Sequence, residues 1–507
     1  MNHSLDLLLV NPGGRGKVYQ NLSGQFAAIE PPVWAGLMAT FIRQRGFSVG
    51  VLDANAEDLS PEETAERVIE ANPVLTSVVV YGHQPSASTQ TMPAASAIVA
   101  ALRERAPKLK SLMVGGHVAA FPEQTLQEEN VDFVCGGEGL YTIAELLEVL
   151  KSERSDYSNV RGLWYWIDET PMSNPSAPLV KDLDREMPDV AWDLLPMEKY
   201  RAHNWHCFGN LERQPYASLY TTLGCPFHCA FCCIQAPFKS GEKMLGYREE
   251  INSYRYWSPE SVVAQIDKLV NQYGVRNIKF ADEMFVLNEK HVIGICDQII
   301  ERGYDLNIWA YARIDTCKES MLDKLRRAGF TWLGIGIESA SRYVRDGVDK
   351  RFGIRDIKET FEKVRSSGIN IGANFIFGLP DDTLESMRET LDLAIDLCPD
   401  WANFYAAMAY PGSKLHKIAI EKGLSLPKNW IGYSQHAYET FPLATEHVSS
   451  GEVLRFRDDA FHAYYTHPRY LAHIEKKFGS QTTQHVQQMT TYRLQRKYTK
   501  DPFPCPT

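Results

Sequence analysis

The sequence has little of what marks secreted, membrane-spanning or nucleic-acid-binding chains. Among its 507 residues, 53 basic side chains stand against 63 acidic ones, a net charge of -10, so the basic excess needed for phosphate binding is missing. No apolar run approaches the ~20 residues of a membrane span, and the first residues lack a basic segment before their short apolar run. Ten cysteines are too sparse for a secreted disulfide framework. We therefore expect a cytoplasmic protein with no nucleic-acid partner and no membrane span.

Three of the cysteines are close together in the sequence. Cys225, Cys229 and Cys232 have C-x3-C-x2-C spacing, which lets a short loop wrap three thiolates around one face of an iron–sulfur cube. Four cysteines are the usual ligands of a four-iron cluster, so three leave one iron open to bind something other than protein. The alternative is a structural zinc site, which needs four closed ligands, and no second cysteine pair follows. Cys233 is treated as a bystander, because adjacent side chains diverge.

This loop resembles that of the radical S-adenosylmethionine (SAM) superfamily, in which an aromatic residue commonly precedes the third cysteine, as Phe231 does here. The resemblance implies that the open iron of a [4Fe–4S] cluster chelates the amino and carboxylate groups of SAM. An electron from the cluster would then split SAM into methionine and a 5'-deoxyadenosyl radical. It also implies an electron donor such as flavodoxin or ferredoxin.

Upstream of the loop, residues 1–151 alternate short apolar runs with helical patterns, which predicts a doubly wound, Rossmann-like α/β domain. We expect strands near 5–10, 48–52, 75–80, 111–115 and 131–135. Ligands of such sheets bind at the carboxyl ends of the strands, where glycine lets the backbone approach a large flat molecule. Gly, Pro and Asn are also ordinary turn formers. The candidate residues at these ends are Asn11, Pro12, Gly13, Gly82, His83, Gln84, Ser86, Gly115, Gly116, His117, Gly137, Glu138 and Gly139.

Together with the helix start at Pro31, Pro32 and Gly36, these motifs resemble the cobalamin-binding domain of B12-dependent radical SAM enzymes. The resemblance implies that the candidate residues bind cobalamin. The Asp-x-His-x-x-Gly motif, by which many B12 proteins supply a histidine to cobalt, is absent. The residue beneath cobalt is therefore left open: His83, Gln84 or a neighbour is a candidate, and His83 is otherwise a simple turn residue.

Residues 152–215 are interpreted as a connector that begins with a hairpin-like stretch. His203, His206 and Cys207 lie within five residues of one another, which raises the question of a metal site. Two histidines and a cysteine make a poor closed site on their own. Aromatic packing over the cofactor cleft is the preferred interpretation.

Residues 216–410 contain six strand–helix units, which suit the partial (β/α)6 barrel of radical SAM enzymes. Reactive groups of parallel barrels lie at the strand C-termini. There the resemblance implies that Asp282 and Glu283 accept hydrogen bonds from the SAM ammonium and that Arg313 binds the methionine carboxylate. It further implies SAM contacts by Phe231, by Glu338 and Ser339 at the ribose, and by Gly378 and Pro380 at adenine. At residues 281–283 the sequence has Ala-Asp-Glu where some relatives have Gly-Gly-Glu. For each of the predicted SAM contacts, the alternative is an ordinary polar group or turn at the end of a barrel strand.

Residues 411–507 are expected to be mostly helical, with an aromatic stripe that packs in a core or an interface. The whole resembles a B12-dependent radical SAM methyltransferase, which would move a methyl from methylcobalamin to an unactivated carbon, or a phosphinate phosphorus, of a small natural-product substrate. A second SAM would remethylate the cobalamin. The rivals are an oxidative cyclase or rearrangement enzyme without methyl transfer, and a non-enzymatic cobalamin sensor. Methylthio transfer is disfavoured, because its three further N-terminal cysteines are reduced here to Cys135 alone.

Overall fold

The N-terminal part of the chain forms a doubly wound sheet, which confirms the predicted fold class. The computed structural model describes residues 5–82, 84, 86–152 and 156–499. Seven strands lie in the order β2-β1-β3-β4-β5-β6-β7, and β1 to β5 are parallel. Their bounds are β1 (Leu5–Asn11), β2 (Val49–Asp53), β3 (Pro73–Val80), β4 (Lys110–Gly115), β5 (Phe133–Cys135), β6 (Leu163–Ile167) and β7 (Thr170–Ser173).

Each face of this sheet carries its own helical layer. Leu7 and Leu9 of β1 pack with α2 and α8, whereas Leu8 and Val10 pack with α4 and α5. Burial on both faces explains why these strands are continuous apolar runs in the sequence. The helices are α2 (Val33–Arg43), α4 (Pro61–Ala71), α5 (Ala87–Arg105), α7 (Pro122–Glu128) and α8 (Leu140–Lys151), with the shorter α1 (Arg15–Tyr19), α3 (Ala54–Glu57) and α6 (Gly116–Ala120) at the strand ends.

The hairpin of β6 and β7 extends this sheet in an antiparallel sense. The sequence analysis placed it at the start of the connector, so part of that segment is continuous with the N-terminal sheet. The domain boundaries at 151, 215 and 410 stay predictions.

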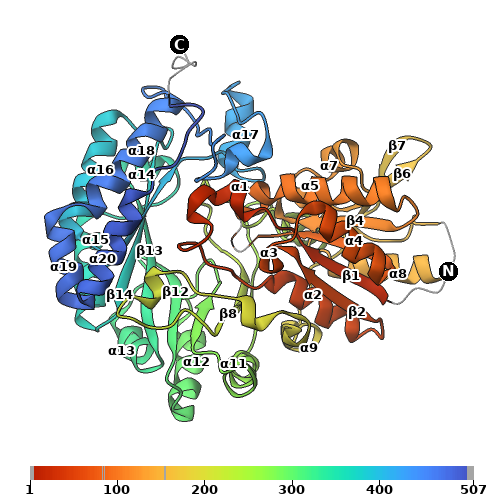
Figure 1. Ribbon diagram of the computed structural model, residues 1–507, viewed down its shortest axis with the longest axis horizontal. Helices are drawn as coiled ribbons and strands as arrows, with labels where there is room; N and C mark the ends of the chain where they lie inside the picture. Colours follow the sequence, from red (N-terminus) through yellow and green to blue (C-terminus); the bar gives the residue numbers. More distant parts are fainter. Residues whose placement is uncertain (1–4, 83, 85, 153–155, 500–507) are drawn as a thin grey trace.

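Six parallel strands follow and curl into a half-barrel in the order β15-β14-β13-β12-β11-β8, confirming the expected partial barrel. Figure 1 shows this half-barrel, in green to cyan, beside the red and orange N-terminal domain. Its strands are β8 (Tyr216–Leu219), β11 (Asn277–Phe280), β12 (Asn307–Arg313), β13 (Phe330–Glu338), β14 (Asn370–Phe377) and β15 (Trp401–Ala406). Its helices are α11 (Pro259–Tyr273), α12 (Glu289–Arg302), α13 (Glu319–Arg327), α14 (Arg342–Gly347), α15 (Ile354–Ser366) and α16 (Leu384–Leu397). Ser258 caps α11 by accepting from the Ser261 amide.

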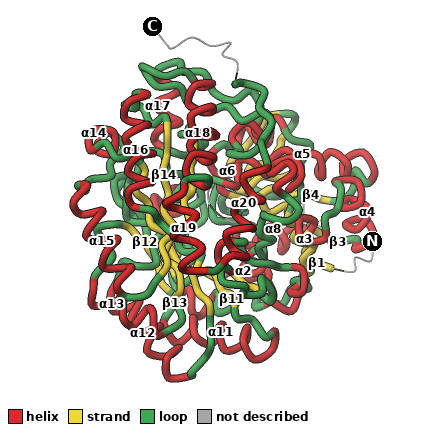
Figure 2. The backbone as a smooth tube through the Cα atoms, turned by 60° about the vertical axis from the view of Figure 1, so that its left-hand side comes forward, coloured by secondary structure: helices red, strands yellow, loops and turns green. Residues whose placement is uncertain are grey.

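The C-terminal region is helical, as expected, and packs on the far end of the half-barrel (Figure 2). It comprises α17 (Lys414–Glu421), α18 (Ser450–Tyr465), α19 (Pro468–Phe478) and α20 (Ser480–Thr491). Part of the aromatic stripe anchors these helices, because the hydroxyls of Tyr464, Tyr465 and Tyr470 donate to the carbonyls of Pro399, Ala402 and Asp400. No helix within the described residues is both long and apolar enough to cross a membrane.

Candidate active site

The three-cysteine loop leaves the half-barrel through a short two-stranded sheet. Strand β9 (Thr222–Gly224) pairs with β10 (Tyr254–Tyr256) and ends directly before Cys225. Gly224 has a φ of +89°, and a Cβ there would lie 2.3 Å from the Ser253 carbonyl oxygen, so only glycine fits this exit. The Asn252 amide donates to the carbonyls of Cys225 and Phe227 at 3.0 and 2.9 Å. Hydrogen bonds to the backbone carbonyls of the loop therefore hold it in place. Its thiols are not needed to fix its shape.

The thiols of Cys225, Cys229 and Cys232 are the predicted cluster ligands. All are free of disulfides. Burial raises the pKa of Cys225 to about 12 and that of Cys232 well above its ordinary value, so these thiols need a bound cation to become thiolates. In the part of the chain that the structure describes, no three His, Cys, Asp or Glu side chains are placed to hold one metal ion, so the three cysteine ligands stay a prediction. Arg313 Nη1 donates to Cys229 Sγ at 3.6 Å.

The two acidic residues after β11 have different roles. Asp282 accepts from the Thr221 amide at 3.0 Å and from the hydroxyls of Thr221 and Thr222, so its carboxylate is used within the protein. Glu283 accepts no hydrogen bond from any described residue. Burial raises its pKa to about 8, with the Lys279 ammonium acting against this and Asp282 adding to it. An ammonium group beside Glu283 would therefore be favoured, which is what the predicted SAM contact requires.

Arg313 lies at the end of β12 with its guanidinium fixed beside the cluster loop. Asp315 accepts from Nε at 2.9 Å and from Nη2 at 3.1 Å, and the guanidinium lies 3.8 Å from the centre of the Phe227 ring. The side chain is buried. A buried cation held this way suits a ligand carboxylate, as predicted.

The remaining predicted SAM contacts surround the ends of β13 and β14. Phe231 packs with Leu379 in one apolar cluster, which brings the cysteine loop and the Gly378–Pro380 turn together. Gly378 has a φ of +80°, and a Cβ there would meet Val453 at 2.5 Å. Ser339 is fully buried and its hydroxyl shares a hydrogen bond with Thr390 at 3.2 Å. Glu338 forms a buried ion pair with Lys350.

A cavity of about 490 Å³ lies between the N-terminal sheet, the inner face of the half-barrel and α18. From the predicted cobalamin set it is lined by Asn11, Pro12, Gly13, Gly82, Gln84 and Ser86. A small cavity of about 20 Å³ adjoins it and is lined by Gly116 and His117 together with Cys233, the residue next to the third cysteine of the loop. Trp34 and Tyr81, stacked at 4.2 Å, line both cavities. The strand ends of the N-terminal domain thus lie beside the cysteine loop at the small cavity, which Cys233 lines.

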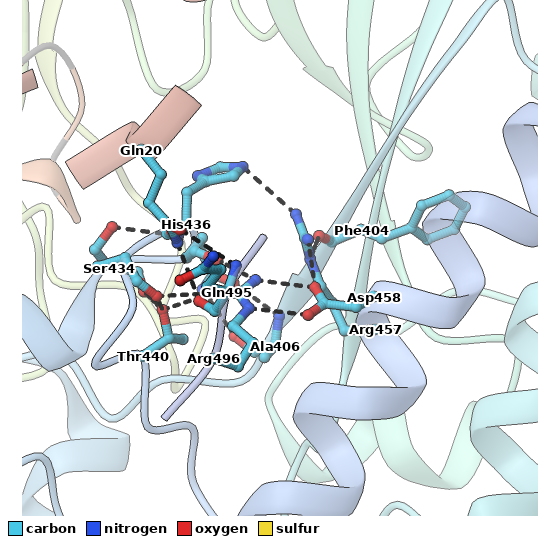
Figure 3. Close-up of polar contacts among 12 residues, drawn as sticks. Gln20, Phe404, Ala406, Ser434, His436, Thr440, Arg457, Asp458, Gln495 and Arg496 are labelled. Carbon is cyan, nitrogen blue, oxygen red and sulfur yellow. Dashed lines mark hydrogen bonds and ion pairs between the residues drawn. The ribbon is translucent and has the colours of Figure 1, made fainter. Parts of the chain in front are cut away.

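The tail of the chain closes this cavity on the C-terminal side (Figure 3). Arg496 donates to both carboxylate oxygens of Asp458 at 2.9 Å and to the Thr440 hydroxyl at 2.8 Å. Gln20 exchanges two hydrogen bonds with the Gln495 backbone, at 3.1 and 3.2 Å. The tail, which lines the cavity, therefore joins the N-terminal domain to α18.

Other predicted cobalamin residues do not line either cavity. Gly115 has a φ of +157°, and a Cβ there would lie 2.1 Å from the Val80 carbonyl oxygen, so it serves a close strand approach. Glu138 pairs with Arg255 at 2.7 Å and accepts from the Val180 amide, which ties the N-terminal domain to the barrel. Gly137 and Gly139 flank it. His83 lies outside the described residues.

Two comparisons with family models match most of the two domains. The radical SAM superfamily model matches residues 219–394, and the B12 binding domain model matches residues 22–147. The chain belongs to the cobalamin-dependent radical SAM enzymes. Its cofactors are therefore a [4Fe–4S] cluster, SAM and cobalamin.

Relatives of this radical SAM enzyme include an uncharacterized methyltransferase, PH0819, of Pyrococcus horikoshii, 28% identical over 444 residues that cover 87% of this chain and 89% of the relative. The anaerobic magnesium-protoporphyrin IX monomethyl ester cyclase of Rubrivivax gelatinosus is 28% identical over 414 residues, covering 80% of this chain and 69% of the cyclase. The fold is shared with OxsB, a cobalamin-dependent SAM radical enzyme solved with aqua-cobalamin and SAM bound, at a TM-score of 0.68 and 17% identity, over 96% of this chain and 72% of OxsB.

The sequence analysis missed a charged cluster inside the half-barrel of this enzyme. Lys279 of β11 donates to Glu30 at 2.9 and 3.2 Å, and Glu30 also contacts His203 Nε2 at 3.1 Å. All three residues line the large cavity. Lys279 could have revealed this cluster in the sequence, because it is a lysine inside the apolar strand sequence NIKFA. A charged side chain at such a position has to face a partner or a cavity.

The possible metal residues of the connector do not converge. His203 contacts Glu30, His206 Nε2 lies 3.0 Å from the Asn307 carbonyl oxygen, and Cys207 contacts Glu212 and Asn277. Between the histidines, Trp205 packs among the rings of Trp309, Trp332 and Trp401. The connector thus packs its aromatic side chains against strands β12, β13 and β15 of the half-barrel.

Proposed function

We propose that this enzyme transfers a methyl group from methylcobalamin to an unactivated carbon, or a phosphinate phosphorus, of a small-molecule natural-product substrate. The observation that carries the proposal is the large cavity, which borders the predicted cobalamin residues Asn11, Gly82 and Gln84 on one side and the inner face of the half-barrel on the other. None of the predicted cluster or SAM residues is among the described residues that line it. The small cavity, which Trp34 and Tyr81 also line, reaches Cys233 next to the cluster loop. A substrate in the large cavity would therefore lie against the predicted cobalamin site and inside the half-barrel.

We assign the cluster and SAM to different residues. When bound, the reduced cluster and SAM supply a 5'-deoxyadenosyl radical that abstracts hydrogen, and methylcobalamin supplies the methyl group. Cys225, Cys229 and Cys232 would hold three irons, and Arg313 would pair with the SAM carboxylate. Glu283 would accept hydrogen bonds from its amino group. A donor such as flavodoxin or ferredoxin would deliver the electron.

The remaining side chains position the reactants and exclude water. Trp34 and Tyr81 are stacked and line both cavities, while contacts of Gln20 and Arg496 hold the tail beside the large one. Shielding of this kind keeps a reactive radical away from solvent and holds it at one substrate position.

A rearrangement or oxidative cyclisation without methyl transfer is the second candidate, favoured by the similarity to the cyclase of Rubrivivax gelatinosus. The two differ in the fate of the SAM methyl group. With methyl-labelled SAM, cobalamin, reductant and a candidate substrate under anaerobic conditions, we expect label in the product and deoxyadenosine in step with it. A matched reaction without cobalamin should lose the labelled product. Deoxyadenosine accompanied by an altered but unlabelled product would refute methyl transfer and support the second candidate.

A further inference from the structure

A buried ion pair lies at the end of β13, between Glu338 and Lys350. The Lys350 ammonium donates to Glu338 Oε1, and the two side chains are only 6% and 7% exposed. The other carboxylate oxygen of Glu338, Oε2, has no hydrogen-bond partner among the described residues. Burying such a pair gains little net stability compared with apolar side chains, so stability alone is a weak explanation for it.

The backbone around this pair is shaped to accommodate it. Glu338 and Asp349, the residue before Lys350, have φ values of +69° and +61°, in the left-handed region that side chains other than glycine occupy infrequently. The register of β13 against β14 also shifts between Gly336 and Glu338. A Cβ at Gly336 would lie 2.5 Å from Glu338 Oε1 and 2.6 Å from Lys350 Nζ. Glycine at 336 therefore leaves the space that the ion pair fills.

The segment that carries Lys350 contacts the cysteine loop directly. The Ala230 amide donates to the Val348 carbonyl at 3.2 Å. Val344 and Val348 pack with Phe231 and Leu379 in one apolar cluster. The ion pair is thus next to the segments expected to enclose the adenosyl part of SAM.

We propose that Lys350 is a positioning residue for SAM: its ammonium holds Glu338 Oε1 and leaves Oε2 to accept from the ribose hydroxyls. The inference rests on the proposed SAM site and is independent of what receives the methyl group. Hydrogen bonds to a carboxylate are stronger than those between neutral groups, so an Oε2 held in place suits a ribose hydroxyl.

The test compares SAM with an analogue that lacks both ribose hydroxyls, using anaerobic protein with a reconstituted cluster. Wild-type protein should bind SAM more tightly than the analogue. Lys350→Met should weaken SAM binding about 10-fold or more, the range expected for losing a hydrogen bond to a charged group, and should bind the two molecules about equally. Lys350→Arg should keep the preference for SAM.

Glu338→Gln supplies the second half of the test. Because Lys350 acts through Glu338, the double variant Glu338→Gln/Lys350→Met should bind SAM no more weakly than Glu338→Gln alone. Lys358→Met is the matched control, since that lysine forms an exposed ion pair with Asp396 and should leave binding unchanged. Cluster absorption checks that each variant is assembled.

The proposal is overturned if Lys350→Met retains the wild-type preference for SAM over the analogue, or if its loss adds in full to that of Glu338→Gln. If Lys350→Met does not assemble, Lys350→Arg decides, because loss of the preference in a variant that keeps the charge contradicts the assigned role. These are binding measurements, so a failure of methyl transfer in the labelling experiment leaves their outcome readable.

Discussion

Cys229→Ala is expected to abolish formation of deoxyadenosine from SAM. With only Cys225 and Cys232 left, the loop has two ligands for a cluster that needs three from the protein. The loss should be visible before any substrate is known, as the disappearance of iron–sulfur absorption near ~400 nm, the range expected for Cys-ligated clusters, after anaerobic reconstitution. Deoxyadenosine in the presence of dithionite should fall to background.

Cys233→Ala is the matched control for the cluster measurement. Cys233 is the immediate neighbour of Cys232, is equally free of disulfides, and lines the small cavity that also touches His117. Its replacement should therefore leave the iron content and the cluster absorption intact. A Cys229→Ala protein with wild-type iron content, or a Cys233→Ala protein without a cluster, would show that the ligands have been assigned wrongly.

Glu30→Gln is expected to destabilise the fold strongly. It removes the charge that faces Lys279, whose side chain is 2% exposed inside the half-barrel. Breaking one side of a buried pair typically costs about 3–5 kcal/mol, because the buried ammonium loses the carboxylate that it contacts. The thermal unfolding midpoint should therefore fall clearly. Cobalamin binding should also fall, because Glu30 lies just before α2, which carries the cavity residue Trp34.

The double variant Glu30→Gln/Lys279→Met should recover much of the lost stability, because no buried charge then remains at the pair. Asp396→Asn provides an exposed comparison, as the ion pair between Asp396 and Lys358 is about half exposed and should contribute no more than about 1 kcal/mol. If Glu30→Gln and wild type had equal unfolding midpoints, the buried pair would not stabilise the fold, and this prediction would be wrong.

The fold and the cluster loop could be predicted because their signals are local. The spacing of Cys225, Cys229 and Cys232 is contained in eight residues, and the two parallel sheets show as apolar runs of strand length separated by helical patterns. Ser258 before Pro259 is a local helix start, which the structure confirms as a cap. The order of the strands then follows the order of the chain in the half-barrel.

The cavity could not be predicted in the same way, because its walls come from distant segments. Gln20 meets the Gln495 backbone, and Glu30 meets Lys279 across 249 positions of the chain. Such contacts depend on how the domains pack, which local periodicity does not encode. Strand-end glycines were also ambiguous for a physical reason: Gly82 lines the large cavity, whereas Gly115 permits a close approach between strands.

We propose that cobalamin and cluster-bound SAM bind close to each other, where the N-terminal domain meets the half-barrel. Electron paramagnetic resonance of anaerobically reconstituted protein, reduced in the presence of cobalamin, tests it most directly. We expect a cluster signal that changes when SAM is added, and a cob(II)alamin signal that shows magnetic coupling to the cluster. A cluster signal unaffected by SAM, together with a cobalamin signal that shows no coupling, would contradict the account.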